Sequence, residues 1–171
     1  MTNLITPFRG KTPVVHPDAF VDPSARVIGH VTIEEGASVW PMAILRADSA
    51  SIRVGRRSAI LDLCLLEAPT DHPVMIGDGA LISHGAVVHG ARIEGLALVG
   101  IGAIILDGSV VSSGCIVAAG SVVSPGTTIP PNSLVVGVPG RVARETTQKE
   151  RDSVLNQINE LYTKSRHYKQ I

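Results

Sequence analysis

The sequence is poor in aromatic residues and carries no net charge. Aromatic side chains make up 3% of the 171 residues, and 15 basic residues balance 15 acidic ones. With few rings and no basic run, the chain lacks the charge and the stacking surfaces of a nucleic-acid-binding protein. Because 44% of the residues are hydrophobic, the core must consist of Val, Ile, Leu and Ala, as in β-rich or repetitive folds.

The chain also lacks long apolar runs. No stretch is long enough to span a bilayer. The N-terminal segment MTNLITPFRGKTPVV does not have the basic and apolar regions of a signal peptide. We therefore expect no membrane association and a cytoplasmic location.

What the sequence does contain is a six-residue repeat. From residue 93 it divides into IEGLAL, VGIGAI, ILDGSV, VSSGCI, VAAGSV, VSPGTT and IPPNSL, and the same rhythm runs earlier. The branched first residue suits a short buried strand. Gly or Asn at the fourth position supplies the positive φ of a corner, and the fifth residue is small. Three sixes make one triangular coil, so the sequence predicts an all-β parallel β-helix, a hexapeptide-repeat solenoid of about seven coils.

The repeat also accounts for the cysteines. Cys64 and Cys115 form no motif with each other, which is typical of a reducing compartment. Both occupy the small fifth position of a six. This position favours core packing over thiol chemistry.

After residue 144 the repeat gives way to a helical pattern. Thr147 and Glu150 have the spacing of a capping box. An apolar stripe at helical spacing follows: Val154, Leu155, Ile158, Leu161 and Tyr162. We expect one domain, with the β-helix over residues 1–144 and a C-terminal α-helix within 145–171 that packs along the solenoid or against a neighbouring subunit.

Three irregular pieces, LRADSASIR, LEAPTDHPVM and VHGAR, interrupt the sixes. Counted as pieces rather than residues, each begins one coil beyond the last. Their second residues, Arg46, Glu67 and His89, should therefore stack on one edge, about one strand spacing apart. The same count stacks Asp62 and His84 on the adjacent face.

This stacking suggests a shared metal site. Glu67 and His89 can bind one ion as vertical neighbours, whereas a corner separates His89 from His84. If three prisms pack around a threefold axis, His84 of one chain meets the Glu67/His89 edge of the next. The sequence thus predicts a homotrimer with a divalent metal held by Glu67, His84 and His89. In the alternative interpretations, Glu67 pairs only with Arg46 and binds no metal, or the histidines are structural.

These residues resemble the γ-class carbonic anhydrase family of left-handed β-helix proteins. VWPMAILRADSASIRVG is similar to the family's strand with its Arg-x-Asp, IGDGALISHGAVVHGARI to its double-histidine coil, and VVGVPGRVARE to the segment before its C-terminal helix. The resemblance covers the whole chain. It implies a left-handed β-helix, a homotrimer with a metal at each subunit interface, and hydration of CO₂ to bicarbonate. The metal would be zinc, or iron or cobalt as in some members.

The resemblance also implies roles for single residues. His84 and His89 match the second and third metal ligands. Arg46 and Asp48 match the Arg-x-Asp that forms ion pairs between subunits beside the active site. Asp62 matches the aspartate of the family's Asn-Ile-Gln-Asp stretch. We therefore expect Asp62 and Arg46 as catalytic residues, and Arg46 and Asp48 at the subunit interface.

The sequence departs from the family at three positions. Glu67 stands where the first ligand histidine is expected, and Ala59 and Leu61 replace the polar Asn and Gln. His72, in the loop after Glu67, is another histidine near this position. Two histidines and one glutamate are a sound ligand set, but the carboxylate lowers the charge of the metal centre and the acidity of its water. Leu61 removes a hydrogen-bonding group, so we expect weak or absent carbonic anhydrase activity.

Two other classes of function stay open. One is an acyltransferase or thioesterase that binds coenzyme A between subunits, although no long loop bearing a catalytic histidine is evident. The other is a non-catalytic assembly or binding subunit that has lost metal ligands. The remaining histidines, His16, His30 and His167, have no stacked partners and are expected at the surface.

Overall fold

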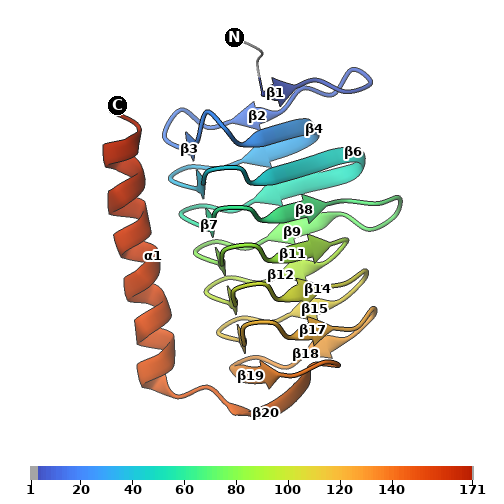
Figure 1. Ribbon diagram of the computed structural model, residues 1–171, viewed down its shortest axis with the longest axis vertical. Coiled ribbons are helices and arrows are strands. Elements are labelled where there is room, and N and C mark those ends of the chain that lie inside the picture. The colour runs from blue at the N-terminus through green and yellow to red at the C-terminus, as the bar shows by residue number, and fades with distance from the viewer. Residues whose placement is uncertain (1–3, 171) are drawn as a thin grey trace.

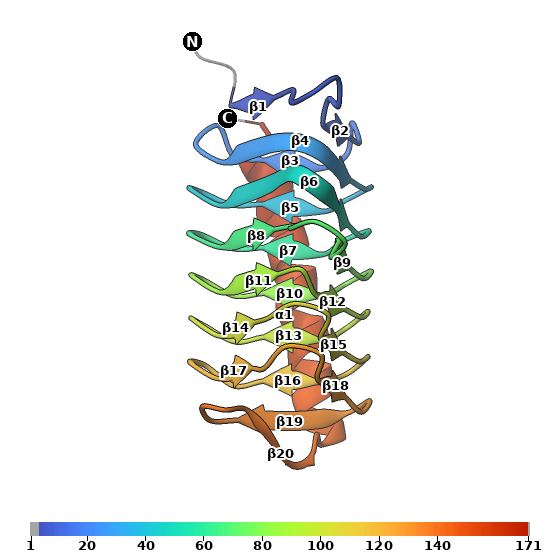
Figure 2. The same cartoon turned by 90° about the vertical axis from the view of Figure 1, so that its right-hand side faces the viewer.

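The computed structural model describes residues 4–170, which form a parallel β-solenoid of about seven turns and one C-terminal helix (Figures 1 and 2). The larger sheet contains β1 (Ile5–Thr6), β2 (Val14–Val15), β4 (Arg26–Ile33), β6 (Ile44–Val54), β8 (Leu65–Glu67), β9 (Val74–Ile76), β11 (Val87–His89), β12 (Arg92–Ile93), β14 (Ile104–Ile105), β15 (Val110–Val111), β17 (Val122–Val123) and β18 (Thr128–Ile129). The smaller sheet contains β3 (Phe20–Val21), β5 (Ser38–Val39), β7 (Ala59–Ile60), β10 (Leu81–Ile82), β13 (Leu98–Val99), β16 (Ile116–Val117), β19 (Ser133–Val136) and β20 (Arg141–Glu145). The hexapeptide-repeat architecture predicted from the sequence is confirmed.

The larger sheet forms two of the three walls, and the long strands β4 and β6 join them. The first half of β6 pairs with β8 and its second half with β9, all in parallel. Beyond this point the two walls separate into β8, β11, β14, β17 and β9, β12, β15, β18. The nine-residue piece LRADSASIR is therefore continuous strand rather than a corner, which the repeat pattern alone did not indicate.

Columns of branched side chains fill the interior of the prism. Leu45, Leu66, Val88 and Ile105 pair in register on successive coils, and each is fully buried. At the corners, glycines at the fourth position of the sixes have φ of 63° to 68°, for example at Gly102. A β-carbon would be strained in this conformation, and so the glycine pattern set the corners as expected.

Both cysteines belong to this core, as predicted. Cys64 and Cys115 are free thiols and are buried. Burial raises the pKa of the Cys64 thiol to about 12 and also raises the pKa of Cys115. The Cys64 thiol donates to the carbonyl oxygen of Ser83 at 3.0 Å. Thiolate chemistry is therefore suppressed at both positions.

The last coil is closed by a strand that the repeat did not predict. β20 turns back and pairs antiparallel with β19, with an irregularity between Leu134 and Val135. This pairing covers the edge of the smaller sheet at its C-terminal end. It also turns the chain toward the start of the helix.

The helix α1 (Gln148–Tyr168) runs back along the smaller sheet toward the first coils (Figures 1 and 2). Its predicted capping box is present, because Thr147 accepts from the Glu150 amide while Glu150 accepts from the Thr147 amide. Val154 and Ile158 are buried in the apolar cluster between helix and sheet. Leu155 departs from the predicted stripe and is 44% exposed. Within residues 4–170, no helix is both long enough and apolar enough to span a membrane.

The capping box gives a pH-dependent prediction. The Arg144 guanidinium, hydrogen-bonded to Glu150, and donors of Thr147 lower the pKa of Glu150 from 4.5 to about 2. A lowered carboxyl pKa stabilises the fold above the ordinary pKa, and this stabilisation is lost as the pH falls toward the folded-state value. Glu150→Ala should therefore lower the melting temperature at pH 7, and the difference from the parent protein should disappear as the pH falls from 4.5 to about 2.

The matched control is Glu160→Ala, a glutamate of the same helix that lies outside the capping box. Thermal unfolding followed by circular dichroism at several pH values measures both variants. A Glu150→Ala effect that persists unchanged at pH 2 would contradict the assignment.

Candidate functional site

Arg46, Glu67 and His89 lie on successive coils, in the register predicted from the irregular pieces. Arg46 is the register partner of Glu67, and Glu67 is the register partner of His89. The guanidinium of Arg46 forms a close ion pair with Oε1 of Glu67. The second carboxylate oxygen, Oε2, lies 3.7 Å from Nε2 of His89. The Glu67 carboxylate thus stands between a cation and an imidazole.

Arg46 also reaches Asp48 of the same strand, with 3.2 Å between Nη1 and Oδ2. The hydrogen bond to Glu67 is the largest cause that raises the pKa of the Arg46 guanidinium. The side chain of Arg46 remains 43% exposed. The Arg46–Glu67 pair that was one alternative in the sequence therefore exists within the chain, and it leaves one oxygen of Glu67 facing His89.

His84 and Asp62 form a second pair on the adjacent corner, also as the stacking predicted. Nδ1 of His84 lies 3.0 Å from Oδ2 of Asp62, and the His84 side chain is 54% exposed. Asp62 therefore contacts a histidine that the sequence proposes as a ligand. The strand β11 separates this pair from His89, because His84 lies in the turn before β11 and His89 is the last residue of that strand. Within residues 4–170, no three His, Cys, Asp or Glu side chains form a group able to hold a metal ion.

A residue that the sequence analysis did not select completes the surroundings of His89. Asp107, at the corner after β14, brings Oδ1 into close contact with Nδ1 of His89. The Asp107 side chain is 39% exposed. Both candidate ligand histidines thus have a carboxylate at Nδ1, which leaves Nε2 as the nitrogen available to a ligand.

The remaining candidates lie beside this arrangement. His72 packs over the corner glycines: its Cβ lies 2.7 Å from the position of a β-carbon at Gly90, and its ring 3.6 Å from that at Gly108. Ala59 and Leu61 are buried in the apolar cluster that includes the helix. Their apolar character therefore has a packing cause in the structure.

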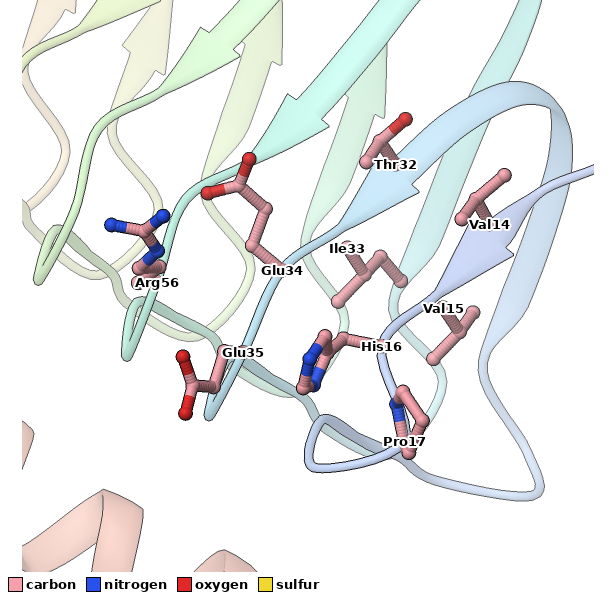
Figure 3. A pocket seen from close by; sticks show the side chains of 9 residues that line it. All are labelled: Val14, Val15, His16, Pro17, Thr32, Ile33, Glu34, Glu35 and Arg56. Carbon is pink, nitrogen blue, oxygen red and sulfur yellow. The ribbon is translucent and has the colours of Figure 1, made fainter.

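The other histidines lie away from the site. His16, His30 and His167 are exposed, as predicted. His16 lines a hollow of about 350 Å³ in the first coils, together with residues of β2 and β4 (Figure 3). Glu34, Glu35 and Arg56 border the same hollow. None of the candidate ligands does, so this hollow is not part of the candidate site.

Proteins of similar sequence include carbonic anhydrases. No family model matches the chain. A probable carbonic anhydrase of Methanocaldococcus jannaschii is 54% identical over 130 residues, which cover 76% of this chain and 82% of that protein. A carbonic anhydrase of Geobacillus kaustophilus is 39% identical over 166 residues, with 97% and 91% covered. The carnitine operon protein CaiE of Salmonella agona is 39% identical over 143 residues, with 84% and 72% covered.

Two solved structures of similar fold cover nearly the whole chain. A Bacillus cereus protein described as a putative acetyltransferase has a TM-score of 0.96 at 32% identity, with 97% of this chain and 96% of that chain covered. A hexapeptide transferase family protein of Anaplasma phagocytophilum has a TM-score of 0.94 at 30% identity, with 98% and 99% covered. Together with the sequence relatives, they establish that the chain belongs to the γ-class carbonic anhydrase-like family of left-handed β-helix proteins with hexapeptide repeats.

Proposed function

We propose that this protein is a homotrimer that binds a divalent metal between subunits and hydrates CO₂ slowly. The proposal is carried by one observation: each chain presents two separate histidines whose Nδ1 atoms face carboxylates, His84 at the corner before β11 and His89 at the end of β11. Neither half-site has enough ligands alone. A threefold arrangement brings His84 of one chain to Glu67 and His89 of the next.

Exposed apolar side chains beside His84 support an interface at this corner. Leu63 follows Asp62 and is 61% exposed, and Ile101, one coil beyond His84, is 60% exposed. Met42, on the preceding coil of the same corner, is 61% exposed. Neighbouring exposed apolar residues next to polar groups favour contact with another protein surface, and here that surface is a second copy.

The wall that carries Glu67 and His89 supports the same arrangement. A row of apolar residues runs down its outer side, in register from coil to coil: Ile44, Leu65, Val87, Ile104 and Val122. These side chains are partly exposed in the single chain. Their burial against the corner of a neighbour would place the His84 corner opposite the Glu67/His89 edge.

The donor set fits a metal of the zinc, iron or cobalt type. Imidazole nitrogens and a carboxylate oxygen are ligands of these ions, and Glu67, His84 and His89 would supply them. A bound divalent ion would supply an acidified water for the hydration of CO₂. Arg46 holds the Glu67 carboxylate in place, and Asp62 orients His84.

Glu67 is the reason for proposing slow hydration. Its carboxylate adds a negative charge where the family resemblance leads us to expect a neutral imidazole, and so reduces the acidity available to the reacting water. The ion pair with Arg46 offsets part of this charge. We place the protein in the cytoplasm because its two buried, unpaired cysteines suit a reducing compartment.

Acyl transfer is the second candidate, because the similar B. cereus structure is described as a putative acetyltransferase. In residues 4–170, the loop between β8 and β9 carries His72, the histidine that such a reaction could use. However, His72 packs against the corner at Gly90. A non-catalytic binding subunit remains the third candidate.

Mixing two single variants tests the shared site. His84→Ala and His89→Ala should each remain folded trimers, because the solenoid is stabilised by its Val and Ile columns, and each should lose zinc binding. Mixed trimers formed by refolding the two together should regain zinc at about one quarter of the interfaces, since only one pairing of subunits restores both histidines. Zinc is measured by metal analysis, and subunit number by sedimentation.

Two results would contradict the proposal. A stable monomer of the parent protein would exclude the shared site. Unchanged zinc content in both single variants would show that the histidines are structural. Activity with acetyl coenzyme A and none with CO₂ would favour acyl transfer.

A further inference from the structure

His89 lies between two carboxylates that face different atoms of its ring. Nδ1 is in close contact with Oδ1 of Asp107, whereas Nε2 lies 3.7 Å from Oε2 of Glu67. The His89 side chain is 32% exposed. A distance of 3.7 Å is too long for a hydrogen bond, so Asp107 is the carboxylate that sets the orientation of the ring.

A difference in corner length brings Asp107 to this position. Val88 pairs with Ile105 before the corner, and Arg92 pairs with Val110 after it. The segment from Val88 to Arg92, VHGAR, is therefore one residue shorter than the matching segment ILDGSV of the next coil. Asp107 lies within the longer of these two corners.

Gly90 provides the space for this contact. A β-carbon at Gly90 would lie 2.8 Å from Oδ1 of Asp107 and 2.7 Å from Cβ of His72. Real β-carbons do not tolerate such distances. The carboxylate thus occupies room that only glycine leaves, beside the histidine that it contacts.

The corner itself does not depend on the Asp107 side chain. The backbone carbonyl of Asp107 accepts from the amide of Gly126, which continues the coil stack. On the next coil, the residue before that glycine is Pro125, so this type of corner forms without a carboxylate. The Asp107 side chain is therefore free for another role.

We propose that Asp107 is a positioning residue for His89: its carboxylate accepts a hydrogen bond from Nδ1–H and thereby presents Nε2, without a proton, to a divalent metal. This inference rests on the proposed function, because it assigns His89 as a ligand. Outer carboxylates of this kind fix the tautomer of a ligand histidine and increase its basicity. Asp62 stands in the same relation to Nδ1 of His84.

Two substitutions and one control test the role of Asp107. Asp107→Ala removes the acceptor, Asp107→Asn keeps a neutral acceptor, and Asp152→Ala removes a carboxylate from α1, away from the site. The tautomer of His89 is read in the metal-free protein by long-range ¹H–¹⁵N NMR at a pH where the imidazole is neutral. The signals of the six histidines are distinguished with His89→Gln. Cobalt affinity of the folded trimers is measured in parallel by absorption spectroscopy.

We expect the Nδ1–H tautomer for His89 in the parent protein and in Asp152→Ala. Asp107→Ala should shift the ring toward Nε2–H and weaken cobalt binding about 10- to 100-fold. Asp107→Asn should retain the tautomer and recover part of the affinity. A purely structural role for Asp107 would leave the tautomer unmoved.

The two proposals fail differently. An Nε2–H tautomer in the parent protein, or an Asp107→Ala variant with unchanged tautomer and cobalt affinity, overturns the role of Asp107. Absence of cobalt binding in the parent protein overturns the proposed function. The NMR measurement still decides whether Asp107 positions the ring.

Discussion

Glu67→His is expected to increase the rate of CO₂ hydration by about tenfold or more, which corresponds to about 1.4 kcal/mol of the activation barrier. The substitution replaces a negatively charged donor with a neutral imidazole, which should tighten zinc binding and make the reacting water more acidic. The new histidine would occupy the coil between Arg46 and His89. Stopped-flow hydration assays of the zinc- and iron-loaded proteins measure the change.

Glu67→Gln is the matched control for this experiment. It removes the carboxylate and the ion pair with Arg46 but adds no imidazole, and so should not produce the increase. Brisk hydration by the parent protein would contradict the conclusion that Glu67 impairs the reaction. Absence of hydration in the parent protein and both variants would favour the non-catalytic or the acyl-transfer candidate.

Leu61→Gln, which would restore the polar group expected from the family, would not test the site cleanly. Leu61 is 6% exposed and belongs to the apolar cluster that contains Val154 and Ile158 of the helix. A glutamine amide at this position would cost about 1–3 kcal/mol unless it found hydrogen-bond partners. Any increase in activity would therefore be accompanied by a loss of stability, because the packing between helix and sheet would be disturbed.

Leu66→Ala should reduce the free energy of unfolding by about 2–5 kcal/mol. Leu66 has no exposed surface and lies between Leu45 and Val88 in the column behind Glu67. Neighbouring coils are fixed by their own hydrogen bonds and cannot collapse fully into the cavity. Chemical denaturation followed by circular dichroism measures the loss.

The control for the core prediction is Leu155→Ala, at a partly exposed position of the helix. Leu155 is 44% exposed, and substitution there should change the free energy of unfolding by no more than about 0.5 kcal/mol. Equal losses in the two variants would show that the stability of the protein does not reside in the stacked columns.

The sequence predicted the fold and much of the site because parallel stacking is regular. Once each piece is known to add one wall of a coil, counting pieces determines which residues are vertical neighbours. This reasoning placed Arg46 beside Glu67, Glu67 beside His89, and Asp62 beside His84. A chain without such a repeat would have given no comparable register.

Contacts across a corner were beyond this reasoning. Asp107 reaches His89 because two successive corners differ in length by one residue, and the pattern gives the lengths but not the direction of a side chain. The unequal corners were nevertheless visible in VHGAR and ILDGSV, and an acidic residue in the longer one was the available signal. The repeat likewise distinguishes inward from outward residues, but it does not predict what covers the outward ones. The packing of the helix over Leu61 and the proposed packing of a second subunit over Leu63 could not be predicted from it.

The returning course of α1 has a consequence for how the molecule unfolds. Solenoids in which each unit contacts only its neighbours can lose terminal units one at a time. Here Arg166, near the end of the helix, contacts Asp18 in the first coils across 148 residues of sequence. Phe20, Trp40 and Tyr168 join the same two regions through ring contacts. The helix therefore links the two ends of the array into one cooperative unit, and the long-range closure that creates this cooperativity also slows folding relative to a simple stack of neighbours.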